Sequence, residues 1–454
     1  MRVVIVGAGL SGLSLAAFLR RLNVDCVVLE QAPFLQANYI APYTLFANAL
    51  SCFKAFGMEH IFTSSDMQPE ACFGIQSHKG KWLLKIANRN LHLPALGAED
   101  VIPLSTAPPA NSESIVSQRL SEVRKQEMGY VPLRCTLPAS YLREALRRCI
   151  PEIKFSAPVI DLLPHDGVKG GVHAVLEDGS TEWGDVVVGA DGMHSTIRRL
   201  LYPSEHVGTS SRSLGMMQID GFVDCPHCPP HLMHPVECWG TRRTLQTVPL
   251  HRFGENTLAF SATLHSPPQE LVDLRQGMDA MEVLQVFQRL LGREYAGFGD
   301  RVATLLSQAK LAVPTEVLEV PVMPRWYNRR AVLMGEAAHG SLPSFLSQDA
   351  SLCVEDAALL AVALLDVPLQ RDSGFEYAFR QYETVRRDRV ERYIRQSRRA
   401  RKLTAMTNAA LRNTLLRLTS PIAVDLAQRW LSNWTYSSQQ LAVDPRIKME
   451  TAFR

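Results

Sequence analysis

The sequence predicts an α/β protein with a β-rich middle region and a helical C-terminal region. The first observation is an apolar run at 3–6, then apolar positions at helical spacing and a second apolar run at 26–29. The second is β-type sequence between 213 and 264, and the third is helical spacing from 375 onwards. Together they predict an α/β unit assembled from separate segments, with a β-rich domain inserted into it.

Composition excludes several classes of protein. The chain has 454 residues, of which 46% are hydrophobic and 20% charged, as in soluble globular proteins. Its net charge of +3 is too small at this length to predict nucleic-acid binding. Nine scattered cysteines predict no disulfide framework and favour the cytoplasm or another reducing intracellular compartment. We expect neither a signal peptide nor a transmembrane segment, because no run of about 20 apolar residues occurs.

The N-terminal segment carries a glycine motif in its full structural setting. Gly7, Gly9 and Gly12 follow the first apolar run as G-x-G-x-x-G and open a helix predicted over 11–22. Gly7 permits a tight turn, Gly9 lets a pyrophosphate approach the backbone, and Gly12 allows close helix packing. The second apolar run ends at Glu30, which is placed to accept hydrogen bonds from ribose hydroxyls. The pattern predicts a Rossmann-like dinucleotide site, with glycines used for packing alone as the weaker alternative.

Two further strand–turn–helix junctions follow. One apolar run leads into Asp191-Gly192. Either Asp191 contributes to a ligand site or it caps the next helix, and the residues alone leave both interpretations open. Another apolar run ends at Gly335-Glu336, before a loop and a helix expected over 350–365. Such junctions are typical places for an anionic cofactor.

Residues 1–30, 185–199 and 329–361 together resemble the flavoprotein aromatic hydroxylases. These are single-component FAD monooxygenases with the para-hydroxybenzoate hydroxylase fold, and the salicylate hydroxylase-like members are most similar. The resemblance spans about residues 1–400. It implies FAD as cofactor, NADPH or NADH as transient reductant, and transfer of one oxygen atom from O2 through a flavin C4a-hydroperoxide. The implied substrate is a small aromatic or otherwise apolar organic molecule.

The resemblance also implies the site residues. For the cofactor these are Gly7, Ala8, Gly9, Leu10, Ser11, Gly12, Glu30, Arg134, Asp191, Gly335, Glu336, Ala350 and Ser351. For the reacting end of the flavin we expect Pro343 as a wall and Asp349 beside the pyrimidine edge, and for the substrate Met217, Gln218, Cys238 and Trp239. Strand residues alternate between faces, so about half of the substrate set should point away from the pocket.

The chain departs from the family in two places. Where relatives carry Gly-Gln-Gly-x-Asn, this chain has Ser347-Gln348-Asp349-Ala350-Ser351. Asp349 is interpreted first as an N-cap turned away from the flavin; altered flavin chemistry and loss of redox function are the alternatives. Ala139 stands where relatives have an arginine, and Arg134 is the expected replacement. Weaker FAD binding is therefore expected.

We expect six segments along the chain. The FAD-binding domain is expected in three of them, at 1–75, 105–204 and 311–370. The substrate domain is expected as a β-insert at 76–104 and a sheet at 205–310, and the C-terminal helices at 371–454.

Several features have ordinary interpretations. Residues 380–402 carry ten Lys or Arg against three acids, which favours a solvated helix over contact with a membrane surface or an acidic partner. The Cys and His residues within 225–234 favour a surface loop over a zinc site, and no metal is expected. His339 is expected to have a structural role.

The protein is expected to be a monomer or a homodimer. Alternative functions are FAD-dependent epoxidation or dehydrogenation of a lipid-like substrate, or a degenerate non-enzymatic protein.

Overall fold

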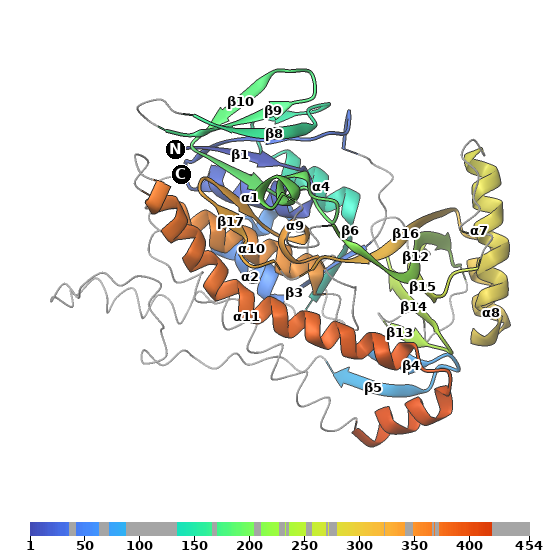
Figure 1. Ribbon diagram of the computed structural model, residues 1–454. Coiled ribbons are helices and arrows are strands. Elements are labelled where there is room, and N and C mark those ends of the chain that lie inside the picture. Colours follow the sequence, from blue (N-terminus) through green and yellow to red (C-terminus); the bar gives the residue numbers. More distant parts are fainter. Residues whose placement is uncertain are drawn as a thin grey trace.

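The computed structural model describes most of the chain. It covers residues 1–419 apart from 36–41, 63–71, 88–133, 166–169, 204–209, 227–231, 233–235, 251–256, 269–270, 272–278, 322, 341–347, 366 and 368–371. Figure 1 shows two layered units with the long helix α11 (Asp372–Thr404) running alongside both. The predicted α/β class, with a β-rich second unit and a helical C-terminal region, is confirmed.

The first unit is built on a mostly parallel six-stranded sheet. Its order is β17-β18-β11-β1-β2-β7, and β17 alone runs antiparallel to its neighbour. The bounds are β1 Arg2–Val6, β2 Asp25–Leu29, β7 Ile153–Lys154, β11 Val186–Gly189, β17 Tyr327–Asn328 and β18 Ala331–Leu333. The central strands are continuous runs of Val, Ile and Leu because both faces of the sheet are covered.

Helices cover one face of this sheet and a small antiparallel sheet covers the other (Figure 1). The small sheet consists of β8 Val159–Pro164, β9 Val172–Leu176 and β10 Thr181–Gly184, with α5 Thr196–Leu201 beside it. The helices that pack together on the other face are α1 Leu10–Arg21, α2 Ala47–Ala55, α4 Ala139–Arg147 and α10 Asp349–Ala363. Short elements complete this unit: β3 Pro42–Phe46, β6 Arg134–Pro138, the 3-10 helix η1 Glu59–Ile61 and α9 Glu336–His339.

The second unit is a seven-stranded sheet backed by helices. Its order is β16-β12-β15-β14-β13-β4-β5. The bounds are β4 Cys72–Ser77, β5 Trp82–Ala87, β12 Arg212–Asp224, β13 Val236–Trp239, β14 Arg243–Pro249, β15 Thr257–His265 and β16 Leu311–Glu319. Helices α7 Ala280–Glu294 and α8 Asp300–Leu306, joined by the 3-10 helix η4 Ala296–Phe298, share a hydrophobic core with one face of this sheet. The six predicted segment boundaries stay a prediction.

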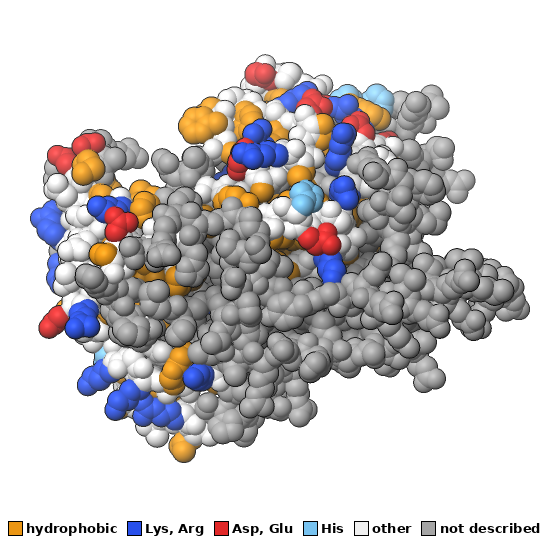
Figure 2. All heavy atoms as spheres, turned by 180° about the vertical axis from the view of Figure 1, so that it is seen from behind, with side chains coloured by type: hydrophobic (Ala, Val, Ile, Leu, Met, Phe, Trp, Pro, Cys, Tyr) orange, Lys and Arg blue, Asp and Glu red, His pale blue; other side chains and the backbone are white. Residues whose placement is uncertain are grey.

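The described surface carries charges of both signs. Figure 2 shows Lys and Arg side chains spread over the face opposite to that of Figure 1, with Asp and Glu among them. Among the residues that the structure describes, no helix is both long and apolar enough to cross a membrane.

Candidate active site

Four sequence motifs meet at one edge of the parallel sheet. Strands β1, β2, β11 and β18 pair in parallel, and their last residues are in register. The residues that follow these strands therefore lie together at the carboxyl edge, namely Gly7, Glu30, Asp191 and Gly335. In sheets of this kind ligands bind outside that edge.

The glycine loop leaves its outer side open. Gly7 has a φ of +107°, and a Cβ there would lie 2.4 Å from the carbonyl oxygen of Ala190, so a larger residue is excluded. A Cβ on Gly9 would meet no heavy atom within 4 Å. Gly9 is the N-cap of α1, and no side chain caps that helix. The first N–H groups of α1 are thus available to an anion.

Glu30 is held by the loop that it faces. Its carboxylate accepts hydrogen bonds from the backbone N–H of Ala8 at 2.8 Å and of Ala32 at 2.9 Å. These bonds fix the orientation of the carboxylate beside the glycine loop. Each carboxylate oxygen keeps further acceptor capacity, so a ribose hydroxyl can still donate to Glu30.

Arg143 reaches the glycine loop, although it is not among the predicted site residues. It projects from α4, and its Nη2 donates to the carbonyl oxygen of Ala8 at 3.2 Å. Its Nε is buried and has no hydrogen-bond partner. Arg134, the expected replacement for the missing arginine, is buried at the start of β6, where its backbone pairs with Phe46. Arg143 is one turn beyond Ala139, so helical spacing could have indicated it.

Asp191 binds the first N–H groups of α5, whose N-cap is Ser195, which is close to the helix-capping role that one sequence interpretation gave it. Its carboxylate accepts from the Ser195 hydroxyl at 2.5 Å and from the backbone N–H groups of Thr196 and Ile197 at 2.7 and 3.1 Å. These bonds hold the turn that carries Gly192, whose φ is +74°. A cofactor role for Asp191 stays a prediction. Asp191 would act indirectly, because its carboxylate holds the Gly192 turn in place.

Gly335 and Glu336 bring the third motif against the other two. Gly335 has a φ of +56°, and a Cβ on it would lie 2.1 Å from Ser11 Oγ, on the first turn of α1. The Oε2 atom of Glu336 lies 3.8 Å from the position of a Cβ on Gly192. The Glu336 side chain is exposed, yet protein atoms surround it closely enough that lost hydration raises its pKa, and Asp349 adds to this.

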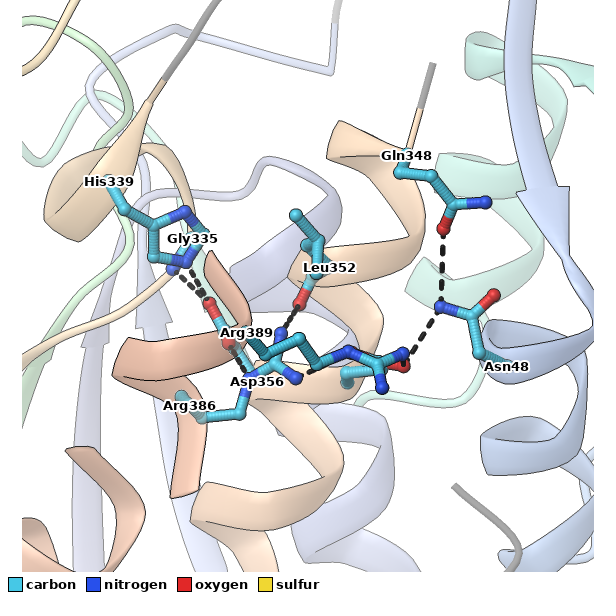
Figure 3. Close-up of polar contacts among 9 residues, drawn as sticks. Asn48, Gly335, His339, Gln348, Leu352, Asp356, Arg386 and Arg389 are labelled. Carbon is cyan, nitrogen blue, oxygen red and sulfur yellow. Dashed lines mark hydrogen bonds and ion pairs between the residues drawn. The ribbon is translucent and has the colours of Figure 1, made fainter. Parts of the chain in front are cut away.

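A buried ionic network holds the Gly335 turn (Figure 3). Asp356 of α10 accepts from the backbone N–H of Gly335 at 2.9 Å, pairs with His339 Nε2 at 2.5 Å and with Arg386 Nε at 2.6 Å. Burial acts to raise the pKa of Asp356, but His339 and Arg386 outweigh it and lower the pKa to about 2. His339 thus has a structural environment, as expected. Asp356 and Arg386 were not predicted.

The same network extends to the start of α10. Glu355 binds Arg386 Nη1 at 2.5 Å and also pairs with Arg389. It accepts from Asn48 Nδ2 of α2 at 2.8 Å, and the same Asn48 amide donates to Gln348 at 3.4 Å (Figure 3). Helices α2, α10 and α11 are therefore joined just behind the N-terminus of α10.

Asp349 is not the N-cap of α10, contrary to the favoured interpretation. Gln348 is the N-cap, with no side-chain cap bond, and Asp349 is the first helical residue. Asp349 is half-buried, and its Oδ1 has no hydrogen-bond partner. Burial raises the pKa of Asp349, and repulsion from Asp220 raises it further. Hydrogen bonds from the backbone N–H groups of Asp349 and Ala350 act in the opposite direction. The carboxylate thus lies against the N–H groups that begin the helix.

Two other residues of this loop have different positions from those expected. Ser351 is fully buried, and its hydroxyl accepts from the backbone N–H of Phe46 at 2.9 Å, so only its backbone could serve a cofactor. Ala350 is buried. Pro343 lies outside the described residues, and its role stays a prediction.

The predicted substrate residues divide between the two faces of the second sheet. Cys238 belongs to the hydrophobic core shared with α7 and α8, and Met217 packs against it, so both point away from the first unit. Gln218 and Trp239 lie on the opposite face. Trp239 is fully buried, with the guanidinium of Arg412 5.7 Å from its ring, whereas Gln218 is half-buried.

That opposite face carries a polar row that the sequence did not reveal. Asp220 is directly opposite Ser261, Ser261 is opposite Gln246, and Gln246 is opposite Glu237. Asp220 also accepts from Gln218 Nε2 at 3.0 and 2.9 Å. Asp220 repels Asp349 of α10 and helps to raise its pKa, so the two carboxylates interact across the two units. The register of four strands is needed to align these side chains.

The residues at the carboxyl edge fit FAD. The open space over Gly9, the uncapped start of α1 and the unpartnered Arg143 Nε would hold the pyrophosphate. Glu30 would bind the adenosine ribose, and the start of α10 would lie at the flavin end. No group of three or more His, Cys, Asp or Glu suited to a metal ion occurs among the residues that the structure describes.

The fold and the site together define a flavin-dependent oxidoreductase. Residues 1–239 match the family model described as an FAD binding domain. The chain belongs to this family, and within it to the flavoprotein monooxygenases and aromatic hydroxylases. FAD is its cofactor.

Curated relatives and solved structures agree with this assignment. The chain is 27% identical to a 3-amino-4-hydroxybenzoate 2-monooxygenase of Streptomyces cremeus, over 88% of this chain and 86% of the relative. It is 25% identical to a 3-hydroxybenzoate 6-hydroxylase of Klebsiella oxytoca, over 96% and 97%. The fold matches HpxO of Klebsiella pneumoniae with FAD and uric acid, at a TM-score of 0.69 and 19% identity over 96% and 97% of the chains. A salicylate hydroxylase substrate complex matches with a TM-score of 0.67 and 19% identity over 98% of both chains.

Proposed function

We propose that this protein uses NADPH or NADH to hydroxylate a small aromatic substrate that carries hydroxyl or amino hydrogen-bond donors. The observation that carries the proposal is the aligned polar row of Asp220, Ser261, Gln246 and Glu237, whose Asp220 is close enough to Asp349 of α10 to raise its pKa. Asp220 is the buried member of this row; it accepts from Gln218, and its carboxylate oxygens keep capacity for a further donor, which a substrate hydroxyl or amino group would supply. The two curated relatives described above are named for hydroxybenzoates, one of them bearing an amino group.

The electrostatics of the row favour a donor over a carboxylate. Burial raises the pKa of Asp220, and it raises the pKa of Glu237 to about 7. Asp220 and Asp349 repel each other when both are ionised. A phenol or aniline group between them would relieve this repulsion, whereas a substrate carboxylate would add to it. The same acids make the pocket unfavourable for a lipid-like substrate.

The chain's own residues bind and orient, and FAD supplies the redox chemistry with the reductant and O2. Arg143 and the start of α1 would hold the pyrophosphate, and the Asp356 network would fix the Gly335 turn. Asp220, supported by Gln218 and Ser261, would orient the aromatic ring. The proposed partners are O2, the nicotinamide reductant and a small-molecule substrate, in a reducing intracellular compartment.

The test is substrate-stimulated oxidation of NADPH and NADH by the purified FAD-loaded protein. We expect stimulation by aminophenols and dihydroxybenzenes, little by unsubstituted benzoate, and one isotope-labelled oxygen atom from O2 in the product. Asp220→Asn should raise the KM for the donor-bearing ring, whereas Met217→Leu, three residues earlier on the other face, should not. Reductant oxidation that no aromatic donor stimulates, or product without labelled oxygen, would refute the proposal.

A further inference from the structure

A cavity lies away from the carboxyl edge, between α11 and the turn that precedes β17. Its volume is about 400 Å3, within the range of roughly 300–1,000 Å3 typical of small-molecule sites. The turn contributes Arg325, β17 contributes Tyr327, and α11 contributes Arg380, Glu383, Thr384, Arg387 and Asp388. The α11 residues share one face of the helix, because the last four lie three, four, seven and eight positions after Arg380.

One arginine of this cavity is fully used in the structure. Arg387 pairs with Glu383 and donates to the carbonyl oxygens of Met323 and Pro324 at 3.0 and 3.2 Å. Glu383 also accepts from the backbone N–H of Trp326 at 3.2 Å. This ion pair fastens the turn to α11 and leaves neither charge for a ligand.

The other two arginines are not neutralised. The side chain of Arg325 makes no hydrogen bond or ion pair with any described residue, and the Tyr202 hydroxyl contacts only its carbonyl oxygen. Arg380 has a single long contact, 3.5 Å from its Nε to the Tyr327 hydroxyl. Both side chains are exposed, and they reach the same cavity from different elements. Asp388 is the remaining acid there, and it opposes them.

We propose that this cavity binds the phosphate or pyrophosphate group of a small phosphorylated ligand. Two guanidinium groups present planar forks of donors that match phosphate oxygens, and the Tyr327 hydroxyl adds a third donor. The sequence alone favoured a solvated basic helix over residues 380–402. Convergence of Arg325 with Arg380, 55 positions apart in the chain, is what the fold adds.

Side chains that line the cavity are linked by direct contacts to the Gly335 turn. The Trp326 ring lies between the Arg387 guanidinium, at 5.3 Å, and the His339 ring, at 5.2 Å. His339 pairs with Asp356, which accepts from the Gly335 N–H. If the proposed function is right, the nicotinamide reductant is one source of the phosphate; a free phosphorylated metabolite is the other.

The test measures pyrophosphate binding to the FAD-loaded full-length protein by isothermal titration calorimetry. Arg325→Ala with Arg380→Ala should weaken binding roughly tenfold or more, because two charge-assisted bonds are lost. Asp388→Asn should tighten it. The control pair, Arg392→Ala with Arg399→Ala, removes two exposed charges from α11 outside the cavity and should change affinity by less than about twofold.

Parallel titrations with NADPH and NADH distinguish the two sources. Weaker NADPH binding in the first pair, with NADH unchanged, would identify the adenosine 2′-phosphate of NADPH as the ligand group; an effect on pyrophosphate alone would identify a free phosphorylated ligand. Equal losses in the two pairs, or no saturable pyrophosphate binding to the wild-type protein, would overturn the proposal. None of these results depends on turnover, so failure of the proposed hydroxylation would be seen separately.

Discussion

Two single residues set how this chain would hold and tune its flavin. Arg143 supplies a cation at the glycine loop, where Ala139 provides none. Asp349 supplies a carboxylate at the start of α10, where a helix terminus would otherwise present only its positive end. The first residue would strengthen the hold on an anionic cofactor, and the second would oppose negative charge at the flavin.

Replacement of Arg143 by Ala should weaken FAD binding. A charge-assisted hydrogen bond contributes about 1.5–3 kcal/mol, so the dissociation constant should rise roughly tenfold or more. The measurement is a fluorescence titration of the apoprotein with FAD. Arg148→Ala is the control, because Arg148 lies at the end of the same helix with its side chain 75% exposed. Equal affinities of the two variants would show that Arg143 does not contact the cofactor.

Replacement of Asp349 by Asn should make bound FAD easier to reduce. Loss of a negative charge at a helix start changes the local energy by about 1–2 kcal/mol, or roughly 20–40 mV for a two-electron couple. The midpoint potential, measured by dye-coupled titration, should therefore become more positive. Asp300→Asn, at the first residue of α8, is the matched control and should leave the potential unchanged. A more negative potential would contradict the assignment.

Helix α10 depends on charges supplied by α11. Glu355 and Asp356 of α10 are both buried, and Arg386 of α11 pairs with both of them. A buried carboxylate that lost its partner would be strongly destabilising. The two helices therefore form one unit, and its position determines where α10 begins.

Asp356→Asn should lower the free energy of unfolding by about 3–5 kcal/mol at neutral pH, because it breaks a buried ion pair. Urea unfolding measures this change. Asp224→Asn removes a carboxylate from an exposed pair with Lys310 and should cost less than about 1 kcal/mol. A loss as small as that of the control would mean that the network does not stabilise the fold.

The same variant predicts a pH dependence. The pKa of Asp356 is lowered to about 2 in the folded protein, against roughly 3.9 in an unfolded chain. Its contribution to stability is therefore complete above about pH 4 and is lost as the pH falls towards 2. The difference in unfolding free energy between wild type and Asp356→Asn should shrink over that range. A constant difference between pH 7 and pH 3 would contradict the assigned shift.

Across the whole molecule, the C-terminal segment joins the two units. Arg398 of α11 pairs with the buried Glu319 of β16 at 2.7 Å. Beyond α11, Arg412 is fully buried and donates to the carbonyl oxygens of Gly240 and Trp239 at 2.7 and 3.1 Å. The C-terminal segment therefore contacts both the cofactor-side network and the substrate sheet, so the spacing between them depends on it (Figure 1).

Arg412→Ala should loosen the turn between β13 and β14. The Gly240 carbonyl oxygen would lose its donor, whereas the Trp239 oxygen would keep the N–H of His78 at 3.1 Å, so the cost in unfolding free energy should be about 1–3 kcal/mol. Hydrogen exchange of the Gly240 amide, which donates to Arg243 at 2.9 Å, should quicken. Arg417→Ala, an exposed change on the same C-terminal segment, should alter neither quantity. Unchanged exchange at Gly240 would show that the turn is stable without Arg412.

Local sequence was sufficient to predict the strand–turn–helix units and the positions of the glycine motif, Asp191 and Gly335 within them. Each of these depends on a strand, a turn and a helix that are contiguous in the chain, and short-range patterns report such units directly. The FAD family followed from the order of those motifs. The sequence shows that Asp349 departs from the family's Gly-rich loop. It does not show that Asp349 is the first residue of the helix, because a shift of one residue decides between the N-cap and the first helical position.

The sequence by itself therefore determined the α/β class and the FAD cofactor, and it predicted the edge of the sheet where we expect FAD to bind. Only the tertiary structure decided which charges interact: Arg143 at the glycine loop, Arg386 against Asp356, and Asp220, which repels Asp349. The physical reason is range. Backbone patterns act over a few residues, whereas an ion pair or a polar row needs side chains that the chain brings together from positions tens to hundreds of residues apart.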